Sequence, residues 1–156
     1  MRAVVQRVSS AAVAVVERET ARELASIGQG LLVLVGIERG DSHEDIRYIA
    51  TKVRGLRVFE DPADTRRHLN LSVLDVGGAV LVVSQFTILG DCRRGLRPSF
   101  DASEASERAR ALYEEVLTEL RAGHLEVHYG EFRATMRVSL VNEGPVTVLL
   151  DSRRRF

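Results

Sequence analysis

The stretch Gly30-Leu31-Leu32-Val33-Leu34-Val35-Gly36-Ile37 decides the fold, because it runs from end to end without a polar side chain. A strand with one face in water alternates apolar and polar residues, whereas a strand covered on both faces reads as a continuous apolar run. We therefore place this stretch at the centre of a sheet, where neighbouring layers cover it on both sides.

The residues before this run predict a strand followed by a hairpin. Ala3 to Val8 and Ala11 to Val16 are rich in valine and alternate with a period of two. The polar residues Glu17 to Thr20 interrupt this pattern before Ala21 to Ile27 continues it, as expected at a hairpin turn. Gly28-Gln29-Gly30 begins like a dinucleotide-binding fingerprint, but it leads into a strand instead of opening a helix, so no nucleotide fold is indicated.

Two helices are predicted in the middle of the chain. The first spans about Ser42 to Arg54, with Asp41 or Ser42 as its cap and apolar residues at helical spacing. The second begins at Ser106, and we expect Ser103 to cap it. Its buried stripe consists of Ala109, Leu112, Val116, Leu117 and Leu120, and Gly123 ends it.

Short strands are predicted in the remaining segments. They are Leu56 to Phe59, Ser72 to Leu74, Ala79 to Val83, Leu125 to Tyr129, Thr135 to Val141 and Val146 to Leu150, with Gly144-Pro145 in the last turn. Strands cluster at both ends of the chain and the helices lie between them, which argues against repeated parallel units. The pattern predicts an α+β fold, in which a mixed or antiparallel sheet curls into a barrel-like form with two main helices.

Length and composition predict one domain over residues 1–156. A hydrophobic content of 45% in 156 residues is sufficient for one core. No stretch approaches the roughly 20 apolar residues that a membrane span needs, so we expect no membrane association. The single cysteine, Cys92, cannot form an internal disulfide, which agrees with a cytoplasmic location.

The charge balance gives no support to a nucleic-acid partner, because 22 basic and 22 acidic side chains cancel. Any contact with RNA must then depend on local patches. The candidates are Arg93, Arg94 and Arg97 in one loop and Arg153, Arg154 and Arg155 at the C-terminus. The alternative for both is a solvated loop and a frayed tail, which is what blocks of charge usually are.

No familiar catalytic or metal-binding signature is present. His124 and His128 have metal-like spacing, but the alternation around them favours a strand and no suitable third ligand is nearby, so we expect neither a metal nor a cofactor. His43 and His68 stand in polar surroundings and are predicted to be surface residues. Cys92 would need a neighbouring base to act as a nucleophile, and a free thiol near a loop is the simpler interpretation.

Two segments differ from ordinary structural sequence. Ser84-Gln85-Phe86-Thr87 places polar side chains and one aromatic ring directly after the strand Ala79 to Val83, as at the lip of a pocket. Asn142-Glu143-Gly144-Pro145-Val146-Thr147 lies between two predicted strands. Taken alone, the first is a polar strand exit and the second a hairpin turn.

Together, the two segments resemble the signatures Ser-Gln-Phe-Thr and Gly-Pro-Val-Thr of the D-aminoacyl-tRNA deacylase family. The resemblance extends over nearly the whole chain in matching order. It includes residues 1–8, 30–37, 69–73, 97–100 and 138–142. One departure is Phe132-Arg133-Ala134, where the family commonly has Phe-Gly-Ala.

The resemblance implies a homodimer whose active sites lie at the subunit interface and bind the 3′ end of aminoacyl-tRNA. The catalytic segment would be Ser84, Gln85, Phe86 and Thr87 of one subunit. The substrate-binding residues would be Gly144, Pro145 and Thr147 of the other, with Arg7 orienting that turn. In the family the Gly-Pro peptide is cis, and its carbonyls exclude an L side chain while accepting D-amino acids and glycine.

Two mechanisms are open for the ester hydrolysis that the resemblance implies. Thr87 would be the nucleophile if a base activated it, but the sequence displays no such base. Alternatively, the ribose 2′-hydroxyl of the substrate helps to activate water, while backbone amides near Phe86 and Thr87 stabilise the oxyanion. The resemblance favours the second mechanism.

Two rival functions come from other classes. One is a small RNA-binding module without chemistry, which would use the arginine clusters with Phe86 or Phe100. The other is a hydrolase of small esters with Thr87 as its nucleophile. The sequence leaves open which D-amino acids are preferred, how far glycyl-tRNA is a substrate, which tRNA bases are sensed, and what Arg153 to Arg155 do.

Overall fold

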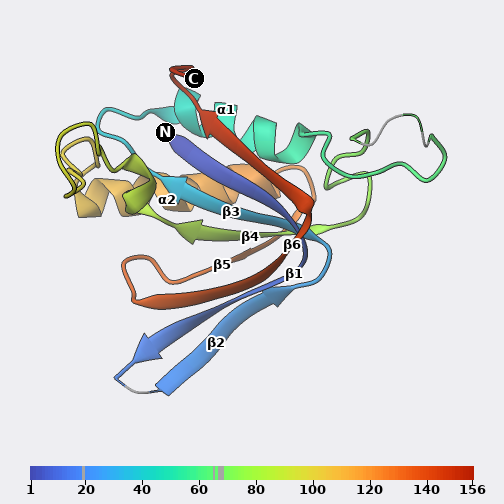
Figure 1. The fold of residues 1–156 in the computed structure, drawn as a ribbon, viewed down its shortest axis with the longest axis horizontal. Coiled ribbons are helices and arrows are strands. Elements are labelled where there is room, and N and C mark those ends of the chain that lie inside the picture. Colours follow the sequence, from blue (N-terminus) through green and yellow to red (C-terminus); the bar gives the residue numbers. More distant parts are fainter. Residues whose placement is uncertain (19, 65, 67–68) are drawn as a thin grey trace.

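The computed structural model describes residues 1–18, 20–64, 66 and 69–156. The chain forms a mixed sheet with two α-helices on one of its faces (Figure 1). The elements are β1 (Arg2–Glu17), β2 (Thr20–Ile27), β3 (Gly30–Gly36), α1 (His43–Gly55), β4 (Ala79–Ser84), the short 3-10 helix η1 (Phe86–Leu89), α2 (Ser106–Arg121), β5 (Glu126–Tyr129) and β6 (Met136–Asp151).

The sheet is mixed, as the sequence predicts. Its strand order is β2-β1-β3-β4-β5, and β6 pairs with the other side of β1. The pairings of β1 are antiparallel, whereas β3, β4 and β5 run parallel to one another. The carboxyl ends of these three parallel strands therefore lie at one edge of the sheet.

The long strand β1 connects the two halves of the sheet. Its first half, from Arg2 to Val8, pairs with β3, and its second half, from Ala11 to Glu17, pairs with β2. Along most of this length β6 occupies the opposite side of β1. The predicted strand and hairpin are therefore confirmed, except that the two valine-rich segments form one strand instead of two.

The apolar run in β3 is covered on both faces, as predicted. Leu31, Val33 and Val35 are buried in the core beneath the helices. Leu32 is buried in a second core on the opposite face, with Leu34 packed against it. A strand that separates two cores needs apolar residues at every position, and this explains the absence of polar side chains.

The second core forms where the sheet curls over itself. Val8, Ala11 and Val13 of β1 pack with Leu81 and Val83 of β4. In Figure 1 the lower parts of β1, β2 and β6 fold beneath β3, β4 and β5, so that the sheet is nearly closed into a barrel. Among the described residues, neither α-helix has the length and apolar character to cross a bilayer.

The first helix agrees with its prediction and the second agrees except at its cap. Ser42 caps α1 in a capping box with Asp45. In α2 the N-cap is Ala105, which has no side-chain oxygen to offer, so the prediction of Ser103 as cap is wrong. Instead, the backbone of Ser103 forms a bridge with Glu38, and its hydroxyl is buried without a hydrogen bond to the helix.

The short strands predicted between α1 and β4 do not form. In the described part of this region, Phe59 and Leu71 make an isolated bridge, and neither Leu56 to Phe59 nor Ser72 to Leu74 becomes a strand. The strand Ala79 to Val83 is confirmed as β4, and Leu125 to Tyr129 as β5. The predicted surface position of His43 is confirmed, because its side chain is 78% exposed, whereas His68 lies outside the described residues.

The sequence suggested a turn between two strands at Gly144-Pro145, and this prediction is wrong. Both halves pair with β1 in the same antiparallel sense and belong to the one strand β6. Between the partner pairs Val8–Asn142 and Gln6–Thr147, β6 advances five residues while β1 advances two. The three extra residues are accommodated as a wide bulge, and glycine and proline tolerate such an interruption of the ladder.

Two of the three C-terminal arginines, Arg153 and Arg155, pair with buried carboxylates and do not form a frayed tail. Arg155 donates to both oxygens of Glu38 and to Asp151, and Arg153 donates to Asp41. The hydrogen bond from Arg155 lowers the pKa of Glu38. Burial acts in the opposite direction on Asp151, but the hydrogen bond from Arg155 leaves its pKa lowered as well. These cations are therefore occupied by carboxylates of their own chain.

Replacing Arg155 with methionine (Arg155→Met) should lower the free energy of unfolding at pH 7 by about 2 kcal/mol, since the carboxylates of Glu38 and Asp151 lose a charged donor. A lowered carboxyl pKa stabilises the fold above about pH 4 and loses this effect as the pH falls further. The parent protein should therefore lose more stability than the variant between pH 5 and pH 3. Urea unfolding at fixed protein concentration measures both effects, and parallel pH profiles would contradict the assignment.

Candidate active site

The first signature leaves the sheet at the carboxyl ends of the parallel strands. Ser84 ends β4, and the backbone N–H of Gln85 donates to the carbonyl of Val35 on β3 at 2.8 Å. Gly36 lets η1 approach closely, because a Cβ there would lie 2.8 Å from Ile88 and 3.1 Å from the carbonyl oxygen of Gln85. Open sheets with parallel strands ordinarily bind ligands at this edge.

The side chains of η1 present a polar pair and an exposed ring. The Gln85 amide Nε2 donates to the hydroxyl Oγ1 of Thr87. Phe86 is 57% exposed, and its ring meets that of Phe100 edge to face with centroids 5.0 Å apart. The amides of Phe86 and Thr87 open the helix and have no acceptor within it, so they can donate to an anionic oxygen.

The second signature is the bulge of residues 142–147 in β6, and the side chain of Asn142 spans it. Its Oδ1 accepts from the backbone N–H of Val146 at 2.9 Å, and its Nδ2 donates to Oγ1 of Thr147 at 3.1 Å. Gln6 of β1 donates to the same hydroxyl at 3.3 Å. The hydroxyl of Thr147 is therefore held by two amide donors of its own chain.

Arg7 supports the bulge from beneath. Its side chain is buried, and it donates through Nε to the carbonyl of Glu143 at 3.0 Å and through Nη1 to the carbonyl of Val58 at 2.7 Å. The Gly144–Pro145 peptide is cis, and Gly144 has φ +112°, a conformation that favours glycine. A Cβ on Gly144 would overlap the guanidinium of Arg7. The arginine and the glycine are thus fitted to each other.

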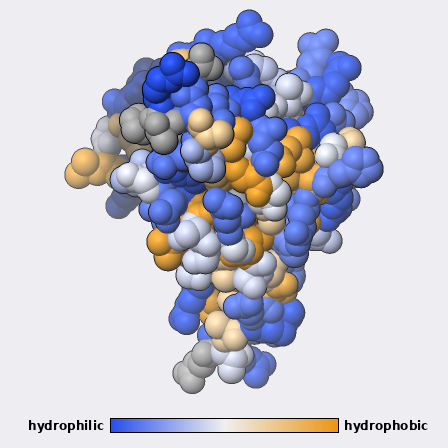
Figure 2. All heavy atoms as spheres, turned by 90° about the vertical axis from the view of Figure 1, so that its right-hand side faces the viewer, coloured by the Kyte–Doolittle hydropathy of each residue, from blue (hydrophilic) through white to orange (hydrophobic). Residues whose placement is uncertain are grey.

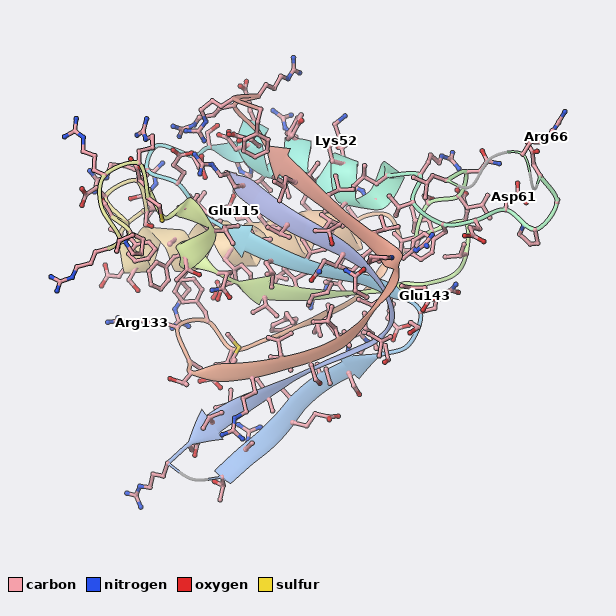
Figure 3. The ribbon with its side chains drawn as sticks, in the orientation of Figure 1. Lys52, Asp61, Arg66, Glu115, Arg133 and Glu143 are labelled. Carbon is pink, nitrogen blue, oxygen red and sulfur yellow. The ribbon has the colours of Figure 1, made fainter. Side chains whose placement is uncertain are left out.

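The two signatures lie far apart within one chain. Ser84 on β4 pairs with Val35 on β3. The bulge lies beside Arg7 on β1, and Arg7 pairs with Leu31 on β3, four residues before Val35. Four residues of strand are about 13 Å, and the three steps from β6 to β4 are about 14 Å. Measured along the surface of the sheet, the separation is therefore roughly 20 Å. Figure 3 shows Glu143 at the bend of β6, away from the end of the sheet where η1 lies.

The structure thus brings the predicted site residues together in two groups. Ser84, Gln85, Phe86 and Thr87 form one group, and Arg7, Gly144, Pro145 and Thr147 form the other. Sequence reasoning missed the supporting roles of Gln6, Asn142 and the Val58 carbonyl. Asn142 stood within a quoted motif, but no local pattern signals Gln6 or Val58, because each acts on a residue distant in the sequence.

Two histidines that the structure describes face carboxylates that belong to neither group. His128 faces Glu126 at 2.7 Å on β5, and His43 faces Glu115 at 3.4 Å on the helices. Across residues 1–18, 20–64, 66 and 69–156, no three histidine, cysteine or acidic side chains stand close enough to hold a metal ion. Cys92 is exposed in the loop after η1. The described residues therefore give Thr87 no histidine or carboxylate that could act as its base.

The loop between β5 and β6 carries the departure from the family pattern. Arg133 has φ +67°, so its backbone adopts the left-handed conformation that glycine adopts without strain. This loop follows β5 and lies at the same edge of the sheet as η1, and Figure 3 shows the Arg133 side chain pointing outward from that end. A long cation is thus attached to a backbone conformation that glycine favours.

Comparison with known proteins agrees with the family resemblance seen in the sequence. The sequence profile described as D-Tyr-tRNA(Tyr) deacylase matches residues 4–151. Proteins named D-aminoacyl-tRNA deacylase from Koribacter versatilis (strain Ellin345) and Anaeromyxobacter dehalogenans (strain 2CP-C) are 52% and 55% identical over 156 residues, which is the whole of each chain.

Solved structures have the same fold. One, titled c-Myc DNA Unwinding Element Binding Protein, has a TM-score of 0.87 at 37% identity, with 97% of this chain and 98% of that chain covered. Another, titled as a probable eukaryotic D-amino acid tRNA deacylase, has a TM-score of 0.76 at 16% identity, with 96% and 97% covered, and bears on the fold alone. With a profile match across nearly its whole length and relatives more than half identical over all of it, the chain belongs to the D-Tyr-tRNA(Tyr) deacylase family and is a hydrolase of ester bonds.

Proposed function

We propose that this chain is a cytoplasmic homodimer that proofreads aminoacyl-tRNA. It would hydrolyse the ester that joins a D-amino acid, or mischarged glycine, to the 3′ end of tRNA and would leave L-aminoacyl-tRNA intact. The observation that carries the proposal is the separation of the two signatures within one chain, four residues along the strands and three strands across the sheet. Neither group forms a complete site alone, so a complete site needs the second signature from a partner.

The outer side of β6 offers a surface for that partner. β6 pairs with β1 along one side, and in the described sheet no strand pairs with its other side. Leu140, Val141 and Leu149 of β6 are exposed at 37%, 54% and 59%. Figure 2 shows apolar side chains gathered in the middle of the face toward which β6 bends, with charged ones around them. A twofold axis through this surface would give the dimer two equivalent sites, each with one signature from each subunit.

The bulge supports a role in reading chirality. Gly144 and Pro145 are exposed, while Arg7 and Asn142 fix the backbone on either side of them. A rigid wall of backbone carbonyls can hold the substrate amino group and leave no space where an L side chain would point. A D side chain would point outward without contact, and glycine has no side chain to exclude. Many D-amino acids would then share one pocket.

For the chemical step we favour water activated with help from the ribose 2′-hydroxyl of the substrate. The Gln85 amide donates its hydrogen to Thr87, and an amide donor cannot remove a proton from that hydroxyl. The N–H groups that open η1 are available to stabilise the oxyanion of the tetrahedral intermediate. The protein would then contribute positioning and oxyanion binding, and the RNA would contribute the remaining group.

The competing function is nucleic-acid binding without chemistry. One solved relative is titled as a binding protein for a DNA unwinding element. Against this alternative, Arg153 and Arg155 are occupied by carboxylates within the chain and are not free for a polyanion. A pure binding module also has no need for an arginine-supported bulge beside an exposed glycine.

The purified protein should deacylate D-tyrosyl-tRNA rapidly and leave L-tyrosyl-tRNA at the rate of spontaneous hydrolysis. The reason is the exclusion of the L side chain by the Gly144–Pro145 wall. Release of labelled amino acid from both esters, measured side by side with a protein-free control, tests this expectation. Loss of neither ester would make the binding module the better hypothesis, and equal loss of both would remove the chirality role.

Replacing Thr87 with alanine (Thr87→Ala) should leave deacylation within roughly tenfold of the parent, because the hydroxyl is not the nucleophile. A D-tyrosyl-tRNA whose terminal ribose lacks the 2′-hydroxyl should react at least about 100-fold more slowly, the usual range for losing a proton-transfer group. Single-turnover rates measure both, with Thr87→Ser as the matched control. The reverse pattern, an inactive Thr87→Ala and a normal deoxy substrate, would identify Thr87 as the nucleophile.

Two inactive variants should restore activity when their subunits exchange. Gly144→Ala forces a Cβ against Arg7, and Gln85→Ala combined with Phe86→Ala removes the side-chain contacts of η1. Each should lower the rate by roughly 100-fold, as misplacement by about 1 Å can. After refolding of an equal mixture, half of the dimers are mixed and each has one intact site, so about a quarter of the parent activity should return.

The control for Gly144→Ala is Gly77→Ala. Gly77 also has positive φ, at +61°, but a Cβ there meets no atom within 4 Å. This variant therefore carries the backbone penalty without the clash and should keep full activity. If the mixture regains nothing while each variant still dimerises, the two signatures do not meet across subunits.

A further inference from the structure

The loop after η1 is a closed hairpin, which we call the basic hairpin, residues 91–101. The backbones of Asp91 and Ser99 exchange hydrogen bonds of 2.7 and 3.0 Å that close its base. The guanidinium of Arg93 donates to both oxygens of Asp91, at 2.9 and 2.6 Å, and lowers the pKa of that carboxyl. The tip turns at Gly95, whose φ is +71°. The hairpin is thus tied together by its own contacts.

The basic hairpin packs directly against the first signature. The ring of Phe100 contacts the exposed ring of Phe86. On the other side of η1, a Cβ on Gly90 would lie 3.0 Å from the Phe100 ring and 3.4 Å from Pro98. Figure 1 shows this yellow loop at the end of the sheet where β4 ends. A ligand bound at Phe86 and Thr87 would therefore have the basic hairpin beside it.

Two cations of the basic hairpin are free to meet such a ligand. A hollow of about 500 Å³ is lined by Asp91, Arg93, Arg94, Arg97, Ser99 and Asp101. Arg93 is matched by Asp91, but Arg94 and Arg97 are exposed and make no ion pair with any residue in the described part of the chain. Asp101 is the remaining charge of the lining, so the hollow has a net positive charge in a protein with none overall.

The proposed function leaves the origin of substrate affinity open. A pocket that lets every D side chain point outward gains no binding energy from that side chain. The affinity must then come from what all substrates share, which is the amino group, the ester and the RNA next to the ester. Guanidinium groups bind phosphodiesters with paired hydrogen bonds as well as charge.

We propose that Arg94 and Arg97 bind phosphodiester groups of the single-stranded 3′ end of the substrate RNA, next to the ester. This inference rests on the proposed function and extends it from the amino acid to the RNA backbone. The hairpin would hold the RNA by its charge without reading its bases, and the ring pair Phe86–Phe100 would lie between the phosphates and the ester.

The test replaces both arginines with alanine (Arg94→Ala with Arg97→Ala) and compares two substrates. One is D-tyrosyl-tRNA, and the other is D-tyrosyl-adenosine, which has the ester and the ribose but no phosphate. Two lost contacts to a single strand should reduce the slope of log(kcat/KM) against log[salt] by about 1.4. Between 50 and 200 mM salt the parent should therefore lose about sevenfold more activity on tRNA than the variant does. Hydrolysis of D-tyrosyl-adenosine should be unchanged.

The matched control replaces Arg18 and Arg22 with alanine (Arg18→Ala with Arg22→Ala). It removes the same charge from exposed residues at the β1–β2 hairpin, at the end of β1 remote from Ser84. A control that reproduces the tRNA effect would overturn the proposal, because general charge would then be the cause. An unchanged salt slope in the test variant, or an equal loss on both substrates, would overturn it too.

Binding of uncharged tRNA over the same salt series separates this proposal from the proposed function. A parent protein that hydrolyses neither ester would contradict the deacylase assignment, yet the arginine contacts would still be visible as a steeper salt slope in the parent than in the variant. Equal slopes for binding would remove the phosphate site even if deacylation is confirmed.

Discussion

The backbone pairing of β1 is the constraint on which the rest of the structure depends. This strand is shared by β3, β2 and β6, so it fixes the curl of the sheet and joins the two cores. It also carries Arg7, which holds the bulge of β6 through the Glu143 carbonyl. Because the same strand pairs with both halves of β6, the interruption at Gly144-Pro145 must protrude as a bulge and cannot reverse the chain.

The parts of the fold that depend on local pattern were predictable. The apolar run of β3 indicates a strand between two cores, and Ser42 with Asp45 indicates the start of α1. The cap of α2 was not predictable, because the place of Ser103 is set by its bridge to Glu38, far away in the sequence. Gly144-Pro145 was misread for a related reason: a turn and a wide bulge use the same residues, and only the strand register distinguishes them.

The candidate site also has a part that the sequence indicates and a part that it does not. Its eight predicted residues stand in two short motifs and in one arginine, and a family resemblance was enough to select them. The Val58 carbonyl that anchors Arg7 was not predictable, since it lies 51 residues away along the chain. The left-handed backbone of Arg133 was also not predictable, because the sequence alone does not show a residue's conformation.

The distance between the two signatures also has a consequence for how the protein is handled. Under the proposed function, a single folded chain keeps its two signatures too far apart to form a site and is inactive alone. Its specific activity would then fall with dilution, following the mass action of subunit association, while its circular dichroism stayed constant. Total activity in a cell would then depend on enzyme concentration in two ways, through the number of chains and through the fraction of them that are dimers.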